Sequence, residues 1–108
     1  MAHWIYFLHA PREHFAETIT DEEAAIMGRH ADYLAALLDD GALLLAGPTL
    51  GRINTGIAIF EAPDEAAAQA ILDADPSIVE GLMRGELRQM RASFVRGGQA
   101  ARGSRSSS

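Results

Sequence analysis

Cysteine is the residue type that the sequence lacks completely. None occurs in 108 residues, which excludes a disulfide scaffold, a thiolate nucleophile and a cysteine-based zinc site. Basic residues are also few, since Lys and Arg total 9 against 15 Asp and Glu, for a net charge of −6. Nucleic acids and anionic membrane surfaces both require a basic footprint, so neither is expected as the main partner.

Long hydrophobic runs and familiar catalytic motifs are missing as well. No apolar stretch approaches the length of a membrane span, and the N-terminus has too short an apolar stretch for a secretion signal. The sequence has no phosphate-binding glycine loop, no G-x-S-x-G elbow and no histidine spacing typical of a metal site. We therefore expect a cytoplasmic protein and no bound metal.

The residues that are present fit one small domain, with 48% hydrophobic and 22% charged residues. Hydrophobic periodicity and turn residues predict, in order, a strand over residues 3–10, a helix from about 20 to 40, strands over 42–47 and 56–62, a helix over 63–74, a further helical turn within 75–82 and a strand over 86–95. The domain is expected to span residues 1–96. Residues 97–108 are small, polar and arginine-containing, and predict a flexible tail.

The predicted helix boundaries rest on local motifs. Thr20 and Glu23 have the spacing of a capping box, and Gly41 is well placed to end the first helix. Pro63 is expected at the first position of the second helix.

The element order β-α-β-β-α-β predicts an α+β, ferredoxin-like fold with a four-stranded antiparallel sheet and both helices on one face. In the first strand Trp4, Tyr6 and Leu8 alternate with His3, Ile5, Phe7 and His9. Because apolar residues occur on both sides of the strands, the helix-free face is also expected to be covered. No chain remains to cover it, so we expect a homodimer that packs sheet against sheet in a dimeric α/β barrel.

His30 interrupts the apolar stripe of the first predicted helix, which is formed by Ile26, Leu34 and either Leu37 or Leu38. A lone histidine in such a place is more often a satisfied core residue than a catalyst. A catalytic interpretation requires a carboxylate that fixes the tautomer of the imidazole and favours its charged form.

Asp75 is the candidate for that carboxylate. It precedes Pro76, so it can equally be a helix N-cap followed by a proline at the first helical position. The two roles are compatible, because a carboxylate has two oxygens. Asp73 is the rival, although its place near the end of a helix favours exposure to solvent.

Other polar residues give weaker signals. His14 lies in a loop, where it is either solvated or part of a lid, and the strand histidines His3 and His9 are not expected to bind metal. Arg12, Arg29 and Arg52 could bind an anionic substrate, but surface arginine is common. Gly47 and Pro48 form a turn whose backbone could line the mouth of a pocket.

Three segments together resemble the YciI-like, or YCII-related, family. They are "HADYLAALLDDGALLLAGP", "GIAIFEAPDEAAAQAILDADPSIVEGL" and "ELRQMRASF". The resemblance runs from about residue 4 to 95, and the "APREHF" loop is typical of a longer-loop subgroup. It implies a dimeric α/β barrel, related in architecture to muconolactone isomerases, with a His–Asp pair formed by His30 and Asp75. The family's characterised activity, dehydrochlorination of a chlorinated hydroxyquinol, implies no metal or organic cofactor.

Two functions follow as hypotheses. The first is a cofactor-independent lyase or isomerase, in which His30 moves a proton of a small aromatic or enolic molecule and Asp75 orients it. The candidate substrate-binding residues are Tyr6, Phe7, His9, Arg12, Tyr33, Gly47 and Pro48. The second is a non-catalytic dimeric module that binds a small ligand or serves regulation, in which His30 only packs.

Overall fold

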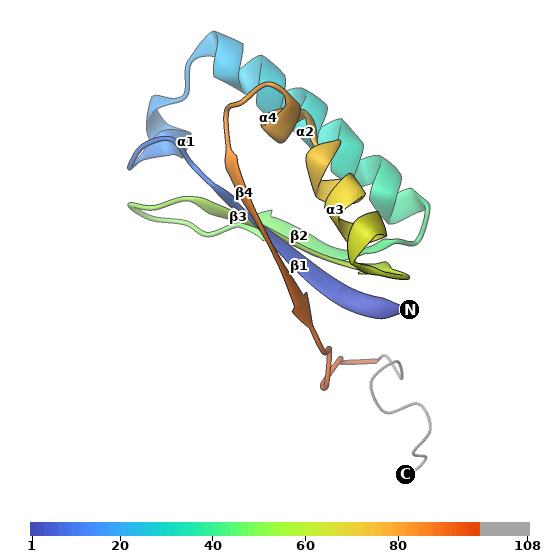
Figure 1. Ribbon diagram of the computed structural model, residues 1–108. Helices are drawn as coiled ribbons and strands as arrows, with labels where there is room; N and C mark the ends of the chain where they lie inside the picture. The colour runs from blue at the N-terminus through green and yellow to red at the C-terminus, as the bar shows by residue number, and fades with distance from the viewer. Residues whose placement is uncertain (98–108) are drawn as a thin grey trace.

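The computed structural model describes residues 1–97, and its four strands form one antiparallel sheet in the order β2-β3-β1-β4 (Figure 1). The elements are β1 (Ala2–His9), α1 (Phe15–Thr18), α2 (Asp21–Asp39), β2 (Leu43–Pro48), β3 (Thr55–Ala62), α3 (Glu65–Asp73), α4 (Pro76–Val79) and β4 (Arg84–Met90). The long helices α2 and α3 cover the same face of the sheet. This is the α+β, ferredoxin-like arrangement that the element order predicted.

Helix α2 begins and ends where local motifs predicted. The side chain of Thr20 accepts a hydrogen bond from the Glu23 amide, and Glu23 accepts one from the Thr20 amide, so the capping box is confirmed. A cap of this kind contributes about 1 kcal/mol to helix stability. The helix ends before Gly41, whose φ of 86° is a conformation that glycine adopts without strain.

The start of α3 differs from its prediction. Asp64, and not Pro63, sets the boundary, because the Asp64 side chain accepts a hydrogen bond from the Ala67 amide at 2.9 Å. A carboxylate satisfies an otherwise unpaired helix amide, which proline cannot do, so Pro63 lies outside the helix.

Two other expectations were wrong. The segment after β1 was predicted as a loop, but it contains the single-turn helix α1. Strand β4 was predicted to reach residue 95 and ends at Met90, which pairs with His3 near the start of β1. Beyond Met90 the neighbouring strand offers almost no further residue to pair with. The predicted tail of residues 97–108 lies outside the described residues except for Gly97.

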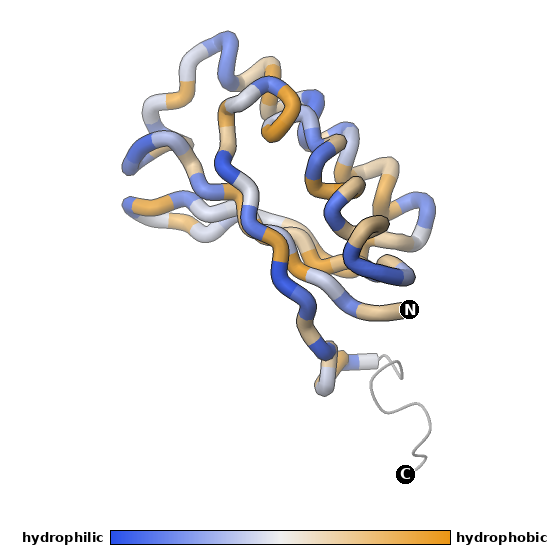
Figure 2. Tube along the Cα trace, viewed as in Figure 1, coloured by the Kyte–Doolittle hydropathy of each residue, from blue (hydrophilic) through white to orange (hydrophobic). Residues whose placement is uncertain are grey.

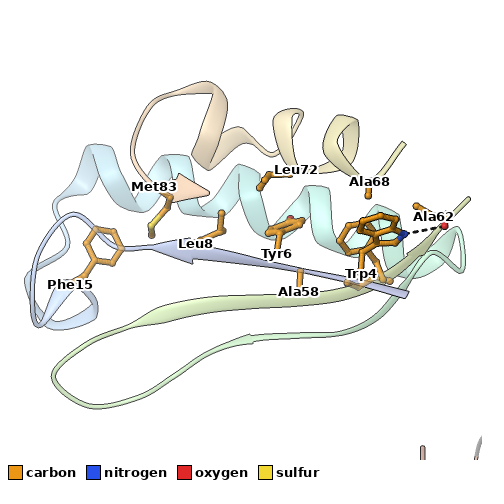
Figure 3. Close-up of a cluster of buried hydrophobic side chains, with 11 residues drawn as sticks. Trp4, Tyr6, Leu8, Phe15, Ala58, Ala62, Ala68, Leu72 and Met83 are labelled. Atoms are coloured by element: carbon orange, nitrogen blue, oxygen red, sulfur yellow. Dashed lines mark hydrogen bonds between the residues drawn. The ribbon is translucent and has the colours of Figure 1, made fainter. Parts of the chain in front are cut away.

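The core lies between the sheet and the helices. Trp4, Tyr6 and Leu8 of β1 are buried on this side (Figure 3), and Phe60 of β3 belongs to the same buried cluster. The rings of Tyr6 and Phe60 meet edge to face with centroids 5.7 Å apart. The indole nitrogen of Trp4 donates to the carbonyl of Ala62 at 3.2 Å. Buried aromatic side chains dominate core energetics, so these residues fix how the helices sit on the sheet.

The opposite face of the sheet has no helix over it. Cross-strand pairing places Ile5 beside Ile59 and Phe7 beside Ile57, and Leu45 of β2 is also paired with Ile59. We call these five residues the helix-free patch. They belong to the central strands β1 and β3 and to the edge strand β2, and Figure 2 shows hydrophobic positions along the strands of the sheet. Leu45 is 63% exposed, so apolar surface on this side is available to a partner.

Candidate active site

His30 and Asp75 meet in the structure although they are 45 residues apart. His30 lies in the middle of α2, and Asp75 is the N-cap of α4, which packs against α2. The imidazole Nδ1 is 2.9 Å from each oxygen of the carboxylate. The apolar stripe of α2 continues through Leu34 and Leu37, which pack on the core, whereas Leu38 is 57% exposed.

Asp75 is fully buried, and protein donors surround its carboxylate. The Tyr6 hydroxyl donates to Oδ2 at 2.7 Å. The backbone amide and the hydroxyl of Ser77 donate to Oδ1 at 2.9 and 2.8 Å. The carboxylate therefore caps α4 and binds His30 at the same time, so the structural and the pairing interpretations of Asp75 hold together.

These donors keep Asp75 ionised. Burial by itself would raise the pKa of the Asp75 carboxyl, but the hydrogen bonds from His30, Tyr6 and the Ser77 amide outweigh burial and lower that pKa below its usual value. Burial, and next the hydrogen bond to Asp75, raise the pKa of Tyr6, so the phenol stays neutral and acts as a donor. The site thus holds one buried negative charge in contact with one imidazole.

The carboxylate also determines which nitrogen of His30 is free. An ionised carboxylate only accepts hydrogen bonds, so Nδ1 carries the proton that Asp75 receives. Nε2 of the neutral ring is then an unprotonated acceptor, and no group among residues 1–97 forms a hydrogen bond with it. The His30 side chain is 14% exposed, so Nε2 is the nitrogen available to a ligand.

A cavity of about 390 Å³ lies beside His30, between α2, the sheet and the β2–β3 loop. Its wall is mostly apolar, and Leu8, Phe15 and Met83 on its wall are drawn in Figure 3. A volume of this size suits a small molecule, and a mostly apolar wall with a few placed polar groups is typical of ligand sites.

Three of the predicted substrate-binding residues line this cavity, namely Tyr6, Gly47 and Pro48. Phe7 and His9 do not, because they project from the helix-free face of β1. Their rings stack with centroids 6.3 Å apart, and Nε2 of His9 is 2.9 Å from Oε1 of Glu86. Alternation along a strand separates them from Tyr6 and His30.

Arg12 and Tyr33 are also engaged away from the cavity. The Arg12 guanidinium donates to both carboxylate oxygens of Glu23 and to Thr18. The Tyr33 hydroxyl donates to the carbonyl of Ile71 at 2.6 Å and thereby connects α2 to α3. Neither residue is among those that line the cavity.

The remaining candidates lie outside the site. Asp73, the rival carboxylate, is exposed and accepts from Gln69 at 2.9 Å. His14 pairs with Glu17 on the surface. Within residues 1–97 no three side chains cluster as metal ligands, and no helix there is long and apolar enough to cross a membrane.

Sequence reasoning missed Ser77 and the role of the Tyr6 hydroxyl. Ser77 follows the N-cap Asp75 by two residues, a spacing at which the amide donates to the cap, so the D-P-S segment carried a usable signal. The sequence carried no signal for the hydrogen bond between Tyr6 and Asp75, because the two residues are 69 positions apart along the chain.

Comparisons with known proteins agree on the fold. The structure resembles that of 5-chloro-2-hydroxyhydroquinone dehydrochlorinase (TftG) from Burkholderia phenoliruptrix AC1100 in complex with 2,5-dihydroxybenzoquinone. The TM-score is 0.59 and the identity 23%, over 83% of this chain and 93% of that chain. No curated protein matches the sequence. The model of the YCII-related domain matches residues 2–91, and the chain therefore belongs to the YCII-related family.

Proposed function

We propose that this protein is a cofactor-independent lyase or isomerase that acts on a small aromatic or enolic molecule bound beside His30. The observation that carries the proposal is the contact of the buried Asp75 carboxylate with Nδ1, which leaves Nε2 free at the edge of a cavity. An imidazole held in this tautomer is a suitable general base. The dehydrochlorinase activity of the structural neighbour supports the same class of reaction.

The proposed chemistry is a proton transfer through His30. Nε2 accepts a proton from a substrate hydroxyl or acidic C–H, and the imidazolium that forms is stabilised by the adjacent Asp75 carboxylate. The same proton is then returned to another substrate atom. On a hydroxylated ring this transfer from oxygen to a ring carbon is an isomerisation to the keto form. When the ring also carries chlorine and a second hydroxyl, that hydroxyl loses its proton to solvent as chloride departs, so that HCl is removed overall and no electron acceptor is needed.

The alternative is a non-catalytic module that binds a small ligand. On that hypothesis His30 needs only apolar packing or a backbone partner, with no cavity beside it and Asp75 out of reach. The 2.9 Å contact with Asp75 and the adjoining cavity favour the catalytic proposal.

The proposal includes a homodimer formed through the helix-free patch. The apolar residues of the patch and their position opposite both long helices support it. A chain of this size buries a modest core by itself, so a second copy would add to the apolar area removed from water.

Turnover of halogenated phenols and lactones, followed by chloride release and by ultraviolet absorbance, tests the reaction. For a compound that is turned over, His30→Ala and Asp75→Asn should each lower kcat by about 100-fold or more, the range expected for loss of a general base. Asp73→Asn is the matched control, because it removes an exposed carboxylate two residues from Asp75 and should leave turnover unchanged. Unchanged turnover in both site variants would contradict the proposal.

A further inference from the structure

The cavity beside His30 has no charged side chain in its wall. Of the described residues that line it, none is Arg, Asp or Glu, and the chain contains no Lys. Most lining residues are aliphatic, aromatic or glycine, and the four polar ones are Tyr6, His30, Thr49 and Asn54. A ligand in this cavity therefore finds no cation with which to pair.

Four arginines lie within three residues of cavity-lining residues, and none of the four lines the cavity itself. Arg84, next to Met83, pairs in register with His9, on the helix-free side of the sheet. Arg12 is held by Glu23, Arg52 by Glu13, and Arg29 lies 3.6 Å from Glu80. The fixed charge closest to His30 is the Asp75 carboxylate itself, which is negative and fully buried. An anionic ligand in contact with the neutral His30 ring would be repelled by this charge, and no arginine or lysine in the wall would attract it.

All but one of the polar side chains in the wall use their hydrogen-bond donors within the protein. The Tyr6 hydroxyl donates to Asp75. The Thr49 hydroxyl donates to the carbonyl of Ile53, and both hydrogen bonds of the Asn54 amide nitrogen go to backbone carbonyls. Only Nε2 of His30 remains as a side-chain hydrogen-bonding group without a partner among the described residues.

From this wall we infer that the site selects a neutral, sparingly hydroxylated ring, such as a halogenated or alkylated phenol, with a hydroxyl directed at Nε2 of His30. Each additional hydroxyl would give up its hydrogen bonds to water and find no free side-chain donor, since those of Tyr6, Thr49 and Asn54 are used, which costs affinity. A carboxylate would be excluded more strongly still, since it would be desolvated without a counter-ion. The structure of the neighbour holds a more polar ring, 2,5-dihydroxybenzoquinone, so the two proteins would differ in the polarity of the ring that they prefer.

The inference deepens the proposed function, on which it rests for the choice of cavity, but its test is binding and requires no turnover. Isothermal titration at pH 7 would compare 4-chlorophenol with 4-hydroxybenzoate, in which a carboxylate replaces the chlorine, and with benzene-1,2,4-triol. We expect 4-chlorophenol to bind at least about tenfold more tightly than either, since unpaired polar groups are strongly disfavoured in such a cavity. Equal affinities, tighter binding of either polar ring, or no binding of 4-chlorophenol would overturn the inference.

A variant that supplies the missing cation makes the test sharper. Leu50 lines the cavity and is 88% exposed, so Leu50→Arg places a guanidinium at the mouth without burying it. The ratio of the 4-hydroxybenzoate to the 4-chlorophenol affinity should then rise by about fivefold or more, as expected for a new pair of opposite charges. Leu50→Gln is the control, because it adds a polar side chain without charge and should leave the ratio unchanged. An unchanged ratio in Leu50→Arg, or the same rise in Leu50→Gln, would contradict selection by charge.

The two proposals can fail separately. If 4-chlorophenol is preferred but His30→Ala and Asp75→Asn leave turnover of an identified substrate unchanged, the specificity of the cavity stands and the catalytic proposal is wrong. If a carboxylated ring binds as tightly as 4-chlorophenol and its turnover depends on His30, the catalytic proposal stands and the inferred specificity is wrong.

Discussion

The hydroxyl of Tyr6 in the core strand β1 donates a 2.7 Å hydrogen bond to Oδ2 of Asp75, the carboxylate that also binds Nδ1 of His30. The contact connects the sheet to the N-terminus of α4 and, through Asp75, to the middle of α2. Tyr6 is thus a positioning residue, since it reaches His30 only through the carboxylate. Its neutral phenol supplies one of the hydrogen bonds that lower the pKa of Asp75.

Tyr6→Phe tests this contact, because it removes the hydroxyl and keeps the buried ring. Loss of a donor to a buried carboxylate should lower the free energy of unfolding by about 1–3 kcal/mol, measured by urea denaturation. The pKa of Asp75 should rise, which NMR titration of its carboxyl carbon can follow. A variant as stable as the wild type, with the pKa of Asp75 unchanged, would show that the bond contributes nothing.

Asp75 should also make the stability of the protein depend on pH. Its folded pKa is lowered, so its stabilisation is complete above the unfolded Asp value of about 3.9 and is lost as the pH falls through the folded pKa. The difference in unfolding free energy between wild type and Asp75→Asn should therefore be largest near neutral pH and shrink on acidification below about pH 4. Urea unfolding between pH 2 and 7 measures it. Asp73→Asn is the matched control, and the same trend in both variants would remove Asp75 as the cause.

Arg12 joins the segment that contains α1 to α2. Its guanidinium lies 5.2 Å from the centroid of the Phe15 ring, which lines the cavity, and binds Glu23 of the capping box. The hydrogen bond from Arg12 lowers the pKa of Glu23 to about 2. In Arg12→Ala we expect that pKa to return towards its usual value and the amides of residues 11–19 to exchange hydrogen faster. Arg29→Ala removes a different surface arginine, and equal acceleration in that variant would contradict the assignment.

The proposed homodimer predicts a change of mass on substitution in the helix-free patch. Ile59 lies between Ile5 and Leu45 in the sheet, so Ile59→Arg should place an unpaired charge in the interface and give a monomer. Sedimentation velocity of wild type and variant measures this. Val79→Arg is the control, because Val79 is an exposed residue of α4, on the helical side of the sheet. A monomeric wild type, or a variant that remains dimeric, would show that this face is not the interface.

The sequence predicted best what depends on neighbours along the chain. The Thr20–Glu23 capping box and the Asp75-Pro76 helix start were visible because cap and amide are a few residues apart. The end of β4 was not visible, because it is determined by where β1 begins.

In the site, too, features set by neighbours in sequence were predictable, whereas contacts between residues far apart in the chain were not. His30 was identified from its place in an apolar stripe. Asp75 was named as its candidate carboxylate from the Asp75-Pro76 segment, and the family resemblance then implied the pair. Strand alternation already separated Phe7 from Tyr6, but only packing reveals which face the helices cover and therefore which ring meets Asp75. Tertiary contacts over such separations leave no periodic signal in one sequence.

Two glycines should respond to alanine with opposite signs, because one faces open space and the other faces the core. A Cβ at Gly28, inside α2, meets nothing within 4 Å, whereas one at Gly85 of β4 would lie 3.0 Å from Leu72 and 3.1 Å from Ile78. Alanine is the better helix former, so Gly28→Ala should raise the free energy of unfolding by about 0.5–1 kcal/mol. Gly85→Ala should lower it by about 1–3 kcal/mol, the cost of overpacking. Urea denaturation of both variants measures the pair, and stabilisation by Gly85→Ala would mean that α3 and α4 can move away from β4 without cost.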